Sequence, residues 1–340
     1  MAKKLTLLLL IVLLVSCNKQ SAKESEVIFA LDTVISIECT GKASKKAIEE
    51  SSDYISKAES QLSRTLPSSE IYQLNRDGLK LNISDISLNL INQAFYYNYF
   101  TNGAFDITIA PISDLWGFTK DKFQVPAIDK INNLLPSIGM EHISVKNKDI
   151  YLDEGAKIDL GGIAKGLLAQ EIKKIYQNNQ IDSGYVNLGG DLLVYKNNPD
   201  HQEWTVGIQN PNKESESQTI GNVKLTNSYI FTSGNYQRYF EDNGKKYHHI
   251  INPKTGFPAD NELVSVTIIS KADGNNGIMC DALSTGLFIL GKEKSINLYK
   301  EHQNMFDMIL ITNQNEVLIS KGIKDIFILT DNEYQLIDIN

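Results

Sequence analysis

Lys157-Ile158-Asp159-Leu160-Gly161-Gly162-Ile163-Ala164-Lys165-Gly166 is the stretch around which the rest of the sequence is organised. A short apolar approach ends at Asp159, two glycines follow, and residues 163–176 then carry apolar side chains at helical spacing. This pattern predicts a strand that turns tightly into a helix. Free backbone N–H groups and the positive dipole end lie at a helix start, so this turn suits a phosphate, with Lys165 as a mobile cation. An ordinary strand-to-helix turn explains the same residues equally well.

The glycines of this stretch match neither G-x-G-x-x-G nor G-x-x-x-x-G-K-[ST], so the pattern supports neither Rossmann nor P-loop chemistry. A second Gly-Gly turn, in the segment 185–191, leads into another strand. Alternating or helical spacing predicts strands at 27–40, 204–209 and 263–270, a hairpin at 143–152, and helices at 43–62 and 84–100. Residues 230–236 and 247–256 look loop-like. Sheet and helix are therefore mixed, and no internal repeat is plain.

Composition and charge limit the classes of protein to consider. The chain has 340 residues, of which 42% are hydrophobic and 22% are charged, as is ordinary for a soluble globular protein. The formal net charge is −8, and no basic stripe appears in the body of the chain. These features argue against nucleic-acid binding.

The N-terminus has the pattern of an export signal. Lys3 and Lys4 precede an apolar run that is too short to span a bilayer. Leu14-Val15-Ser16-Cys17 resembles a bacterial lipobox, so we expect a signal peptide at 1–16, lipid such as palmitate on Cys17, a polar tether at 17–26 and the folded unit at 27–340. A plain signal peptide with a chance cysteine is the alternative. The expected location is membrane-anchored, facing the periplasm or the cell exterior.

Several residues suggest a site that handles a diphosphate. Asp281 and Thr285 are four residues apart in an expected helix and share one face. One carboxylate and one hydroxyl suit Mg²⁺ that is already bound to a diphosphate, although a helix cap and a back-bonded threonine give the same pattern. His249 lies in a turn-rich segment, where it could act chemically or simply brace the turn. Cys39 and Cys280 lack metal-type spacing and are expected to be buried free thiols.

Taken together and in order, these segments resemble the ApbE family of FAD:protein FMN transferases. The resemblance runs from about residue 31 to residue 291 and includes 63–75, 103–118, 159–166, 187–191, 232–236, 249–256 and 281–285. It implies mixed α+β layers related to the T-fold, with FAD held in a cleft. It also implies that Mg²⁺ binds the FAD diphosphate and that FMN passes to a threonine hydroxyl of an exported flavoprotein subunit, with release of AMP.

The resemblance also implies roles for individual residues. The metal ligands would be the main-chain carbonyl of Gly162 and the side chains of Asp281 and Thr285, and His249 would help to deprotonate the acceptor threonine. The flavin-nucleotide positions would be Ala104, Phe105, Asp106, Asp159, Lys165 and Ile250. The chain departs from the family at Leu31-Asp32-Thr33, where Met-Gly-Thr is usual, and at Thr65, where an aromatic ring is usual.

Two rival functions share the expected site. In an FAD pyrophosphatase, water would replace the threonine, and FMN and AMP would be released. A non-catalytic lipoprotein would store or deliver FAD. Asp281, Thr285 and His249 argue against storage, because a storage protein has no use for a metal and a base in one cleft.

Overall fold

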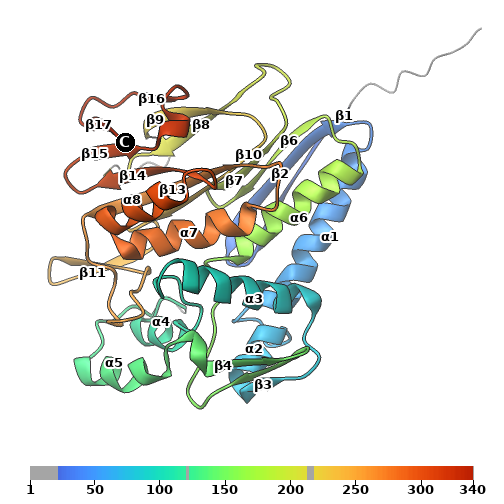
Figure 1. Cartoon of the computed structure of the whole chain (residues 1–340). Coiled ribbons are helices and arrows are strands. Elements are labelled where there is room, and N and C mark those ends of the chain that lie inside the picture. Colours follow the sequence, from blue (N-terminus) through green and yellow to red (C-terminus); the bar gives the residue numbers. More distant parts are fainter. Residues whose placement is uncertain (1–21, 120–121, 213–217, 340) are drawn as a thin grey trace, which may run out of the picture.

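A nine-stranded mixed sheet forms the centre of the computed structural model, which describes residues 22–119, 122–212 and 218–339 (Figure 1). Only the β15–β17 pair is parallel among its paired strands. In spatial order the strands are β1 (Ala22–Ala30), β2 (Thr33–Gly41), β6 (Ser183–Leu188), β7 (Asp191–Tyr195), β10 (Ser228–Gly234), β13 (Leu263–Lys271), β14 (Asp307–Thr312), β15 (Glu316–Ile319) and β17 (Gln335–Asp338).

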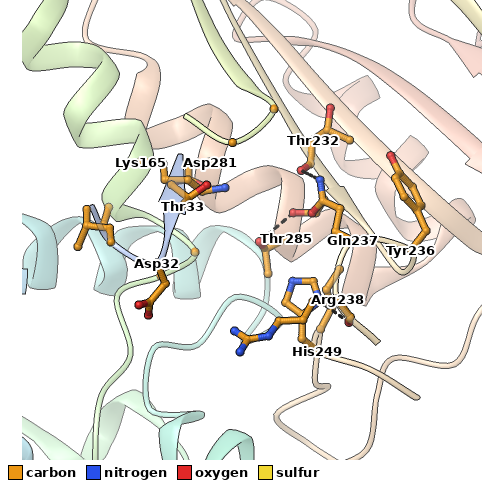
Figure 2. A pocket seen from close by; sticks show the side chains of 18 of the residues that line it. Asp32, Thr33, Lys165, Thr232, Tyr236, Gln237, Arg238, His249, Asp281 and Thr285 are labelled. Carbon is orange, nitrogen blue, oxygen red and sulfur yellow. Dashed lines mark hydrogen bonds between the residues drawn. The ribbon is translucent and has the colours of Figure 1, made fainter. Parts of the chain in front are cut away.

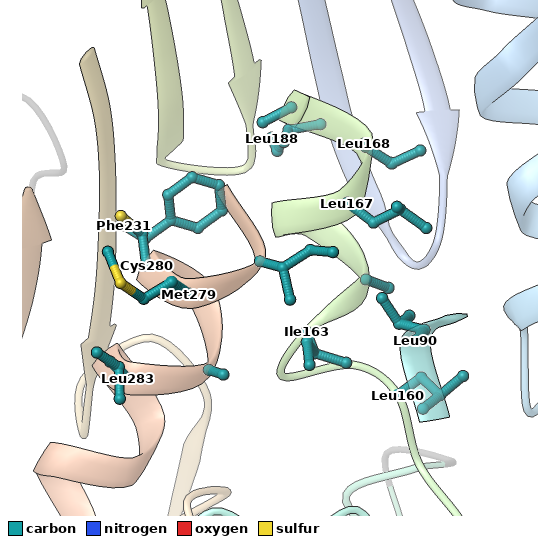
Figure 3. Close-up of a cluster of buried hydrophobic side chains, with 14 of the residues drawn as sticks. Leu90, Leu160, Ile163, Leu167, Leu168, Leu188, Phe231, Met279, Cys280 and Leu283 are labelled. Atoms are coloured by element: carbon teal, nitrogen blue, oxygen red, sulfur yellow. The ribbon is translucent and has the colours of Figure 1, made fainter. Parts of the chain in front are cut away.

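One face of the sheet packs against helices. In β2, Ile35, Ile37 and Cys39 alternate with more exposed residues and are fully buried. They face the layer of α1 (Ser44–Leu62), α6 (Ala164–Asn178) and α7 (Gly277–Leu290) (Figure 1). Figure 3 shows the core between α6, α7 and the sheet, with Leu167 on α6, Met279 on α7 and Phe231 on strand β10 (Ser228–Gly234). The predicted helices at 43–62 and 163–176 are therefore confirmed.

A smaller sheet covers part of the opposite face. It consists of β16 (Phe327–Leu329), β9 (Thr219–Leu225) and β8 (Trp204–Gln209). Val206 and Ile208 of β8 form a second buried cluster with Val194, Ile230 and Ile309 of the large sheet. The strand predicted at 204–209 is confirmed, and it belongs to this covering layer.

The remaining elements form the lower part of the molecule and its edges in Figure 1. Ser84 caps α3 as expected, because its Oγ accepts a hydrogen bond from the Ser87 N–H at 3.3 Å. The elements are α2 (Glu70–Asp77), α3 (Asp85–Phe100), α4 (Ala110–Trp116), α5 (Ile128–Leu134), α8 (Lys292–Glu301), the three-stranded sheet of β3 (Leu79–Lys80), β5 (Asp149–Leu152) and β4 (Ile143–Lys146), and the hairpin of β11 (Tyr239–Asp242) and β12 (Lys245–His248).

Three local predictions were wrong. The strand expected at 27–40 is the β1–β2 hairpin, because Leu31 and Asp32 adopt left-handed φ angles of 50° and 57° and reverse the chain. The approach to Asp159 makes only one bridge, between Ile109 and Lys157, because its partner segment enters α4 directly afterwards. Residues 230–234, expected in a loop, lie in the central strand β10.

The N-terminal expectations are mostly outside the described residues. The signal peptide at 1–16 and Cys17 lie there. Because β1 begins at Ala22, the later part of the tether expected at 17–26 lies in the sheet, and the folded unit starts before residue 27. No helix among residues 22–119, 122–212 and 218–339 is long and apolar enough to cross a bilayer.

Candidate functional site

A cleft of about 1330 Å³ opens at the start of α6. Figure 2 shows side chains of α6, α7, β10 and the segment after β12 pointing into it. All ten site residues expected outside the N-terminal segment line this cleft, although their segments are far apart in sequence. They are Ala104, Phe105, Asp106, Asp159, Gly162, Lys165, His249, Ile250, Asp281 and Thr285.

A close helix crossing brings Asp281 to the first turn of α6. A Cβ added at Gly277 would lie 2.4 Å from the carbonyl oxygen of Gly166, so the two glycines allow α6 and α7 to touch through their backbones. The Gly166 N–H then donates to Asp281 Oδ2 at 2.8 Å. The expected helix start therefore does hold an acidic group, but that group is a side chain of the protein.

Lys165 is held by an ion pair. Its ammonium group contacts the carboxylate of Asp191, whose other oxygen accepts a hydrogen bond from the Thr232 N–H at 2.7 Å. The expectation of a mobile cation at Lys165 is therefore wrong. Burial together with the charge of Asp191 raises the pKa of Asp281, against the opposing charge of Lys165. With both carboxylates ionised, one lysine leaves one negative charge uncompensated.

The three residues expected to bind a metal line the same cleft. Thr285 Oγ1 lies 3.1 Å from Ser233 Oγ, and a Cβ at Gly162 would lie 3.6 Å from Thr285 Oγ1. Among the described residues, no three or more His, Cys, Asp or Glu side chains gather as a metal-binding group. A carboxylate, a hydroxyl and a backbone carbonyl nevertheless match the hard oxygen ligands of Mg²⁺, and a bound cation would favour the ionised form of Asp281. The residues present fit this ion if the substrate supplies further oxygens.

Asp159 is oriented by an arginine that sequence reasoning missed. Arg64 Nη1 donates to Asp159 Oδ2 at 2.6 Å, and its other nitrogen contacts the carboxylate of Asp114. The Gly161 N–H donates to Asp159 Oδ1 at 2.8 Å. Burial opposes ionisation, but Arg64 and this N–H lower the pKa of Asp159. Asp159 therefore stays ionised and fixes the Gly161-Gly162 turn at the cleft.

The segment around Phe105 forms another wall. Phe105 is buried, and a Cβ at Gly162 would lie 3.2 Å from its ring. Asp106 Oδ1 accepts hydrogen bonds from the N–H and the hydroxyl of Thr108 at 2.8 and 2.5 Å, and Asn98 donates to Oδ2 at 3.3 Å. Burial raises the pKa of Asp106 despite these bonds. Asp106 thus shapes its own loop as well as lining the cleft.

His249 has a ring orientation suited to accepting a proton. Its Nδ1 lies 3.1 Å from the carbonyl oxygen of Arg238. Figure 2 shows the His249 ring next to Arg238. A carbonyl can only accept, so Nδ1 carries hydrogen in this bond, and the neutral ring keeps a lone pair on Nε2. Burial lowers the pKa of His249 to about 4, so the ring is neutral near pH 7. His248 is different, because it bonds Ala259 and the Ile250 N–H outside this cleft.

The two departures from the family pattern also line the cleft. Leu31 and Asp32 form the turn of the β1–β2 hairpin. Thr33 packs directly against Gly189, because a Cβ added at Gly189 would lie 2.1 Å from Thr33 Oγ1. The Gly189-Gly190 turn expected between two strands is confirmed. Thr65 contributes a hydroxyl, which lies 3.1 Å from Ser63 Oγ.

Comparison with known proteins places this site in context. A sequence model of the ApbE family matches residues 31–310. An FAD:protein FMN transferase of Klebsiella pneumoniae strain 342 is 32% identical over 240 residues, which cover 70% of this chain and 72% of that protein. One of Vibrio cholerae serotype O1 is 30% identical over 284 residues, with 82% and 83% covered.

Solved structures share the fold. The crystal structure of the ApbE protein from Thermotoga maritima matches with a TM-score of 0.81 at 27% identity, covering 90% of this chain and 99% of that one. The flavin transferase ApbE from Vibrio cholerae gives a TM-score of 0.79 at 24% identity, again with 90% and 99% covered, which shows the shared fold alone. The expected mixed helix and sheet fold is thereby confirmed, and the chain belongs to the ApbE family.

Proposed function

We propose that the chain transfers FMN from FAD to a threonine hydroxyl of an acceptor protein and releases AMP. One observation carries this proposal: the oxygen donors, the start of α6 and the lone pair of His249 line a single cleft. The names of the relatives supply the two substrates, since both are FAD:protein FMN transferases. A cleft of about 1330 Å³ has room for a dinucleotide.

Mg²⁺ would be held by the carbonyl of Gly162, the carboxylate of Asp281 and the hydroxyl of Thr285. When bound, it would neutralise charge on the diphosphate, as divalent ions do in phosphoryl transfer. The protein itself prepares this place. The Gly166 N–H orients Asp281, and Ser233 orients Thr285.

The group transfer exchanges one phosphate bond for another. The acceptor oxygen forms a bond to the phosphorus of the FMN half, and the bond from that phosphorus to the bridging oxygen breaks. AMP leaves with the bridging oxygen, and FMN stays on the acceptor as a phosphoester. His249 Nε2 takes the hydroxyl proton, because Arg238 occupies Nδ1. The negative diphosphate nearby would raise the pKa of His249 and make it a better base.

Intact mass measurement tests this function against its rivals. The full chain is mixed with FAD, Mg²⁺ and the acceptor domain modified by the Vibrio cholerae relative. We expect the acceptor mass to increase by one FMN unit while AMP appears in equal amount. Free FMN and AMP with an unmodified acceptor would instead indicate an FAD pyrophosphatase. Bound, uncleaved FAD would indicate a carrier.

We also propose that the mature chain is an exported lipoprotein anchored through Cys17. The support is the lipobox-like Leu14-Val15-Ser16-Cys17 after a short apolar run. Cys17→Ser should release the folded unit from the membrane fraction or block its processing. An unchanged membrane fraction in this variant would contradict the lipid anchor.

A further inference from the structure

The outer face of the β1–β2 hairpin carries three large, exposed apolar side chains. Val27, Phe29 and Val34 are 69%, 73% and 54% exposed. Phe29 is paired with Val34 across the two strands, and Val27 is two residues from Phe29, so all three point to the same face. We call these three residues the hairpin patch. Exposed apolar groups that gather in this way often mark an interaction surface.

The hairpin does not need these side chains for its own packing. Its inner face carries Ile28, Ala30, Ile35 and Ile37, which belong to or pack against the main core. The outer face of the sheet is covered further along, where β8 and β9 bury residues of β7, β10 and β14. Among the described residues, β8 and β9 do not extend over the hairpin patch, so its three apolar side chains are exposed to solvent.

The hairpin patch is continuous with the cleft. Residues 31–34 line the cleft at the hairpin turn, and Ser36 lines it on the same outer face as Val34. Val34 therefore belongs both to the patch and to the cleft wall. A protein that rests on the patch therefore contacts one wall of the cleft that contains His249.

We infer that the hairpin patch is the docking surface for the acceptor protein. This inference rests on the proposed function, in which one substrate is a dinucleotide and the other is a protein. The charged wall of the cleft suits the diphosphate, whereas exposed valine and phenylalanine suit the apolar surface of a folded domain. The docked domain would present its hydroxyl from a segment that enters the cleft beside Val34.

The first test separates docking from chemistry. Phe29→Ser and Val27→Ser, at the two patch residues outside the cleft lining, are compared with the unaltered full chain, with the acceptor domain of the Vibrio cholerae relative and a short peptide around its modified residue as probes. We expect the KM for the domain to rise about tenfold, because central apolar contacts carry much of a binding free energy. FAD affinity, kcat and transfer to the peptide should stay unchanged. Tyr99→Ser, at an 84% exposed aromatic residue of α3 outside the cleft lining, is the matched control.

The second test identifies the occupant. Phe29→Cys is made in a full chain that also carries Cys17→Ser and is labelled with a thiol reagent, against a low background because the remaining native cysteines, Cys39 and Cys280, are buried. We expect labelling of the free full chain and protection by the acceptor domain. Protection by phosphatidylglycerol–phosphatidylethanolamine vesicles instead would identify a membrane contact. No labelling of the free chain would mean that residues 1–21 cover the patch. Protection by vesicles, absence of labelling, or an unchanged KM in the serine variants would each overturn the inference. Inactivity of the unaltered chain and of Tyr99→Ser would instead overturn the proposed function.

Discussion

Two walls of the same cleft are built in opposite ways. The wall made by α6 and α7 holds Lys165 on Asp191 and Asp281 on the Gly166 N–H, with Ser233 next to Thr285. The hairpin wall instead exposes Val34, beside Val27 and Phe29. Fixed, partnered polar groups suit transition-state charge, which rewards preorganisation, whereas exposed apolar groups suit recognition of a surface. The contrast separates residues needed for chemistry from residues needed for choice of partner.

The largest expected effect is at Asp281, in the polar wall. Asp281→Asn keeps the volume of the side chain but removes the only charged group among the three expected metal ligands. We predict a loss on the order of a thousandfold in both FMN transfer and FAD cleavage by water, as for other single electrostatic stabilisers. Steady-state assays with increasing Mg²⁺ measure it.

A surface aspartate serves as the control for this change. Asp85→Asn, at a side chain that is 83% exposed on α3, should keep full activity. A thermal unfolding curve of Asp281→Asn checks that the fold is retained. Full activity of Asp281→Asn in the presence of a chelator would exclude a role for the metal at this carboxylate.

The next largest effect is expected at His249. Without a base, the acceptor hydroxyl is a weak nucleophile, so His249→Ala should slow transfer by about a hundredfold or more while FAD affinity is kept. Pre-steady-state transfer at saturating FAD measures the rate, and His201→Ala, in a surface loop, is the control. Loss of FAD binding with full transfer at saturation would mean that His249 only braces its turn.

The pH dependence gives an independent check on His249. The pKa of this residue is lowered to about 4 by burial, so the neutral, proton-accepting ring is present above that value and is lost as pH falls through it. At saturating Mg²⁺ we predict that kcat/KM keeps its plateau well below the ordinary histidine pKa of about 6.5. In His249→Ala, the decrease in kcat/KM at low pH that protonation of this residue causes should disappear. An unchanged decrease in the variant would assign it to another group.

A smaller effect, on stability, is expected where the two helices cross. Gly277→Ala places a Cβ 2.4 Å from the Gly166 carbonyl oxygen, so α6 and α7 must separate. We predict a decrease of about 1–3 kcal/mol in the free energy of unfolding, with weakened activity because Asp281 moves with α7. Denaturant unfolding measures the change. Gly274→Ala, where a Cβ would be 3.3 Å from the end of the Asn276 side chain rather than from backbone, should be much closer to neutral.

Local patterns in the sequence predicted more of the polar wall than of the hairpin wall. The start of α6 is predicted by a glycine pair that precedes apolar residues at helical spacing. The shared position of Asp281 and Thr285 on one helix face is predicted by their spacing of four residues. Their partners could not be read in this way. Arg64 reaches Asp159 across 95 positions of sequence, and only the folded chain brings these groups together.

The hairpin shows why local rules fail elsewhere. The turn at Leu31 and Asp32 lacks glycine, so an uninterrupted strand was the natural prediction, and the left-handed φ angles depend on the surrounding fold. The strand β10 was missed for a related reason. Its Thr232, Ser233 and Gly234 have the composition of a loop, but β13 pairs with the whole strand through Gly234, while β7 pairs with its first three residues.

The division between the two walls is tested most directly by measuring two products in one reaction. Asp281→Asn and Phe29→Ser are each incubated with labelled FAD, Mg²⁺ and acceptor domain below its KM, and FMN on the domain and FMN free in solution are both counted. We predict that Asp281→Asn loses both products. Phe29→Ser should lose FMN on the domain alone, with no decrease in free FMN. Equal loss of both products in Phe29→Ser, or persistence of either product in Asp281→Asn, would contradict the assignment of chemistry to one wall and recognition to the other.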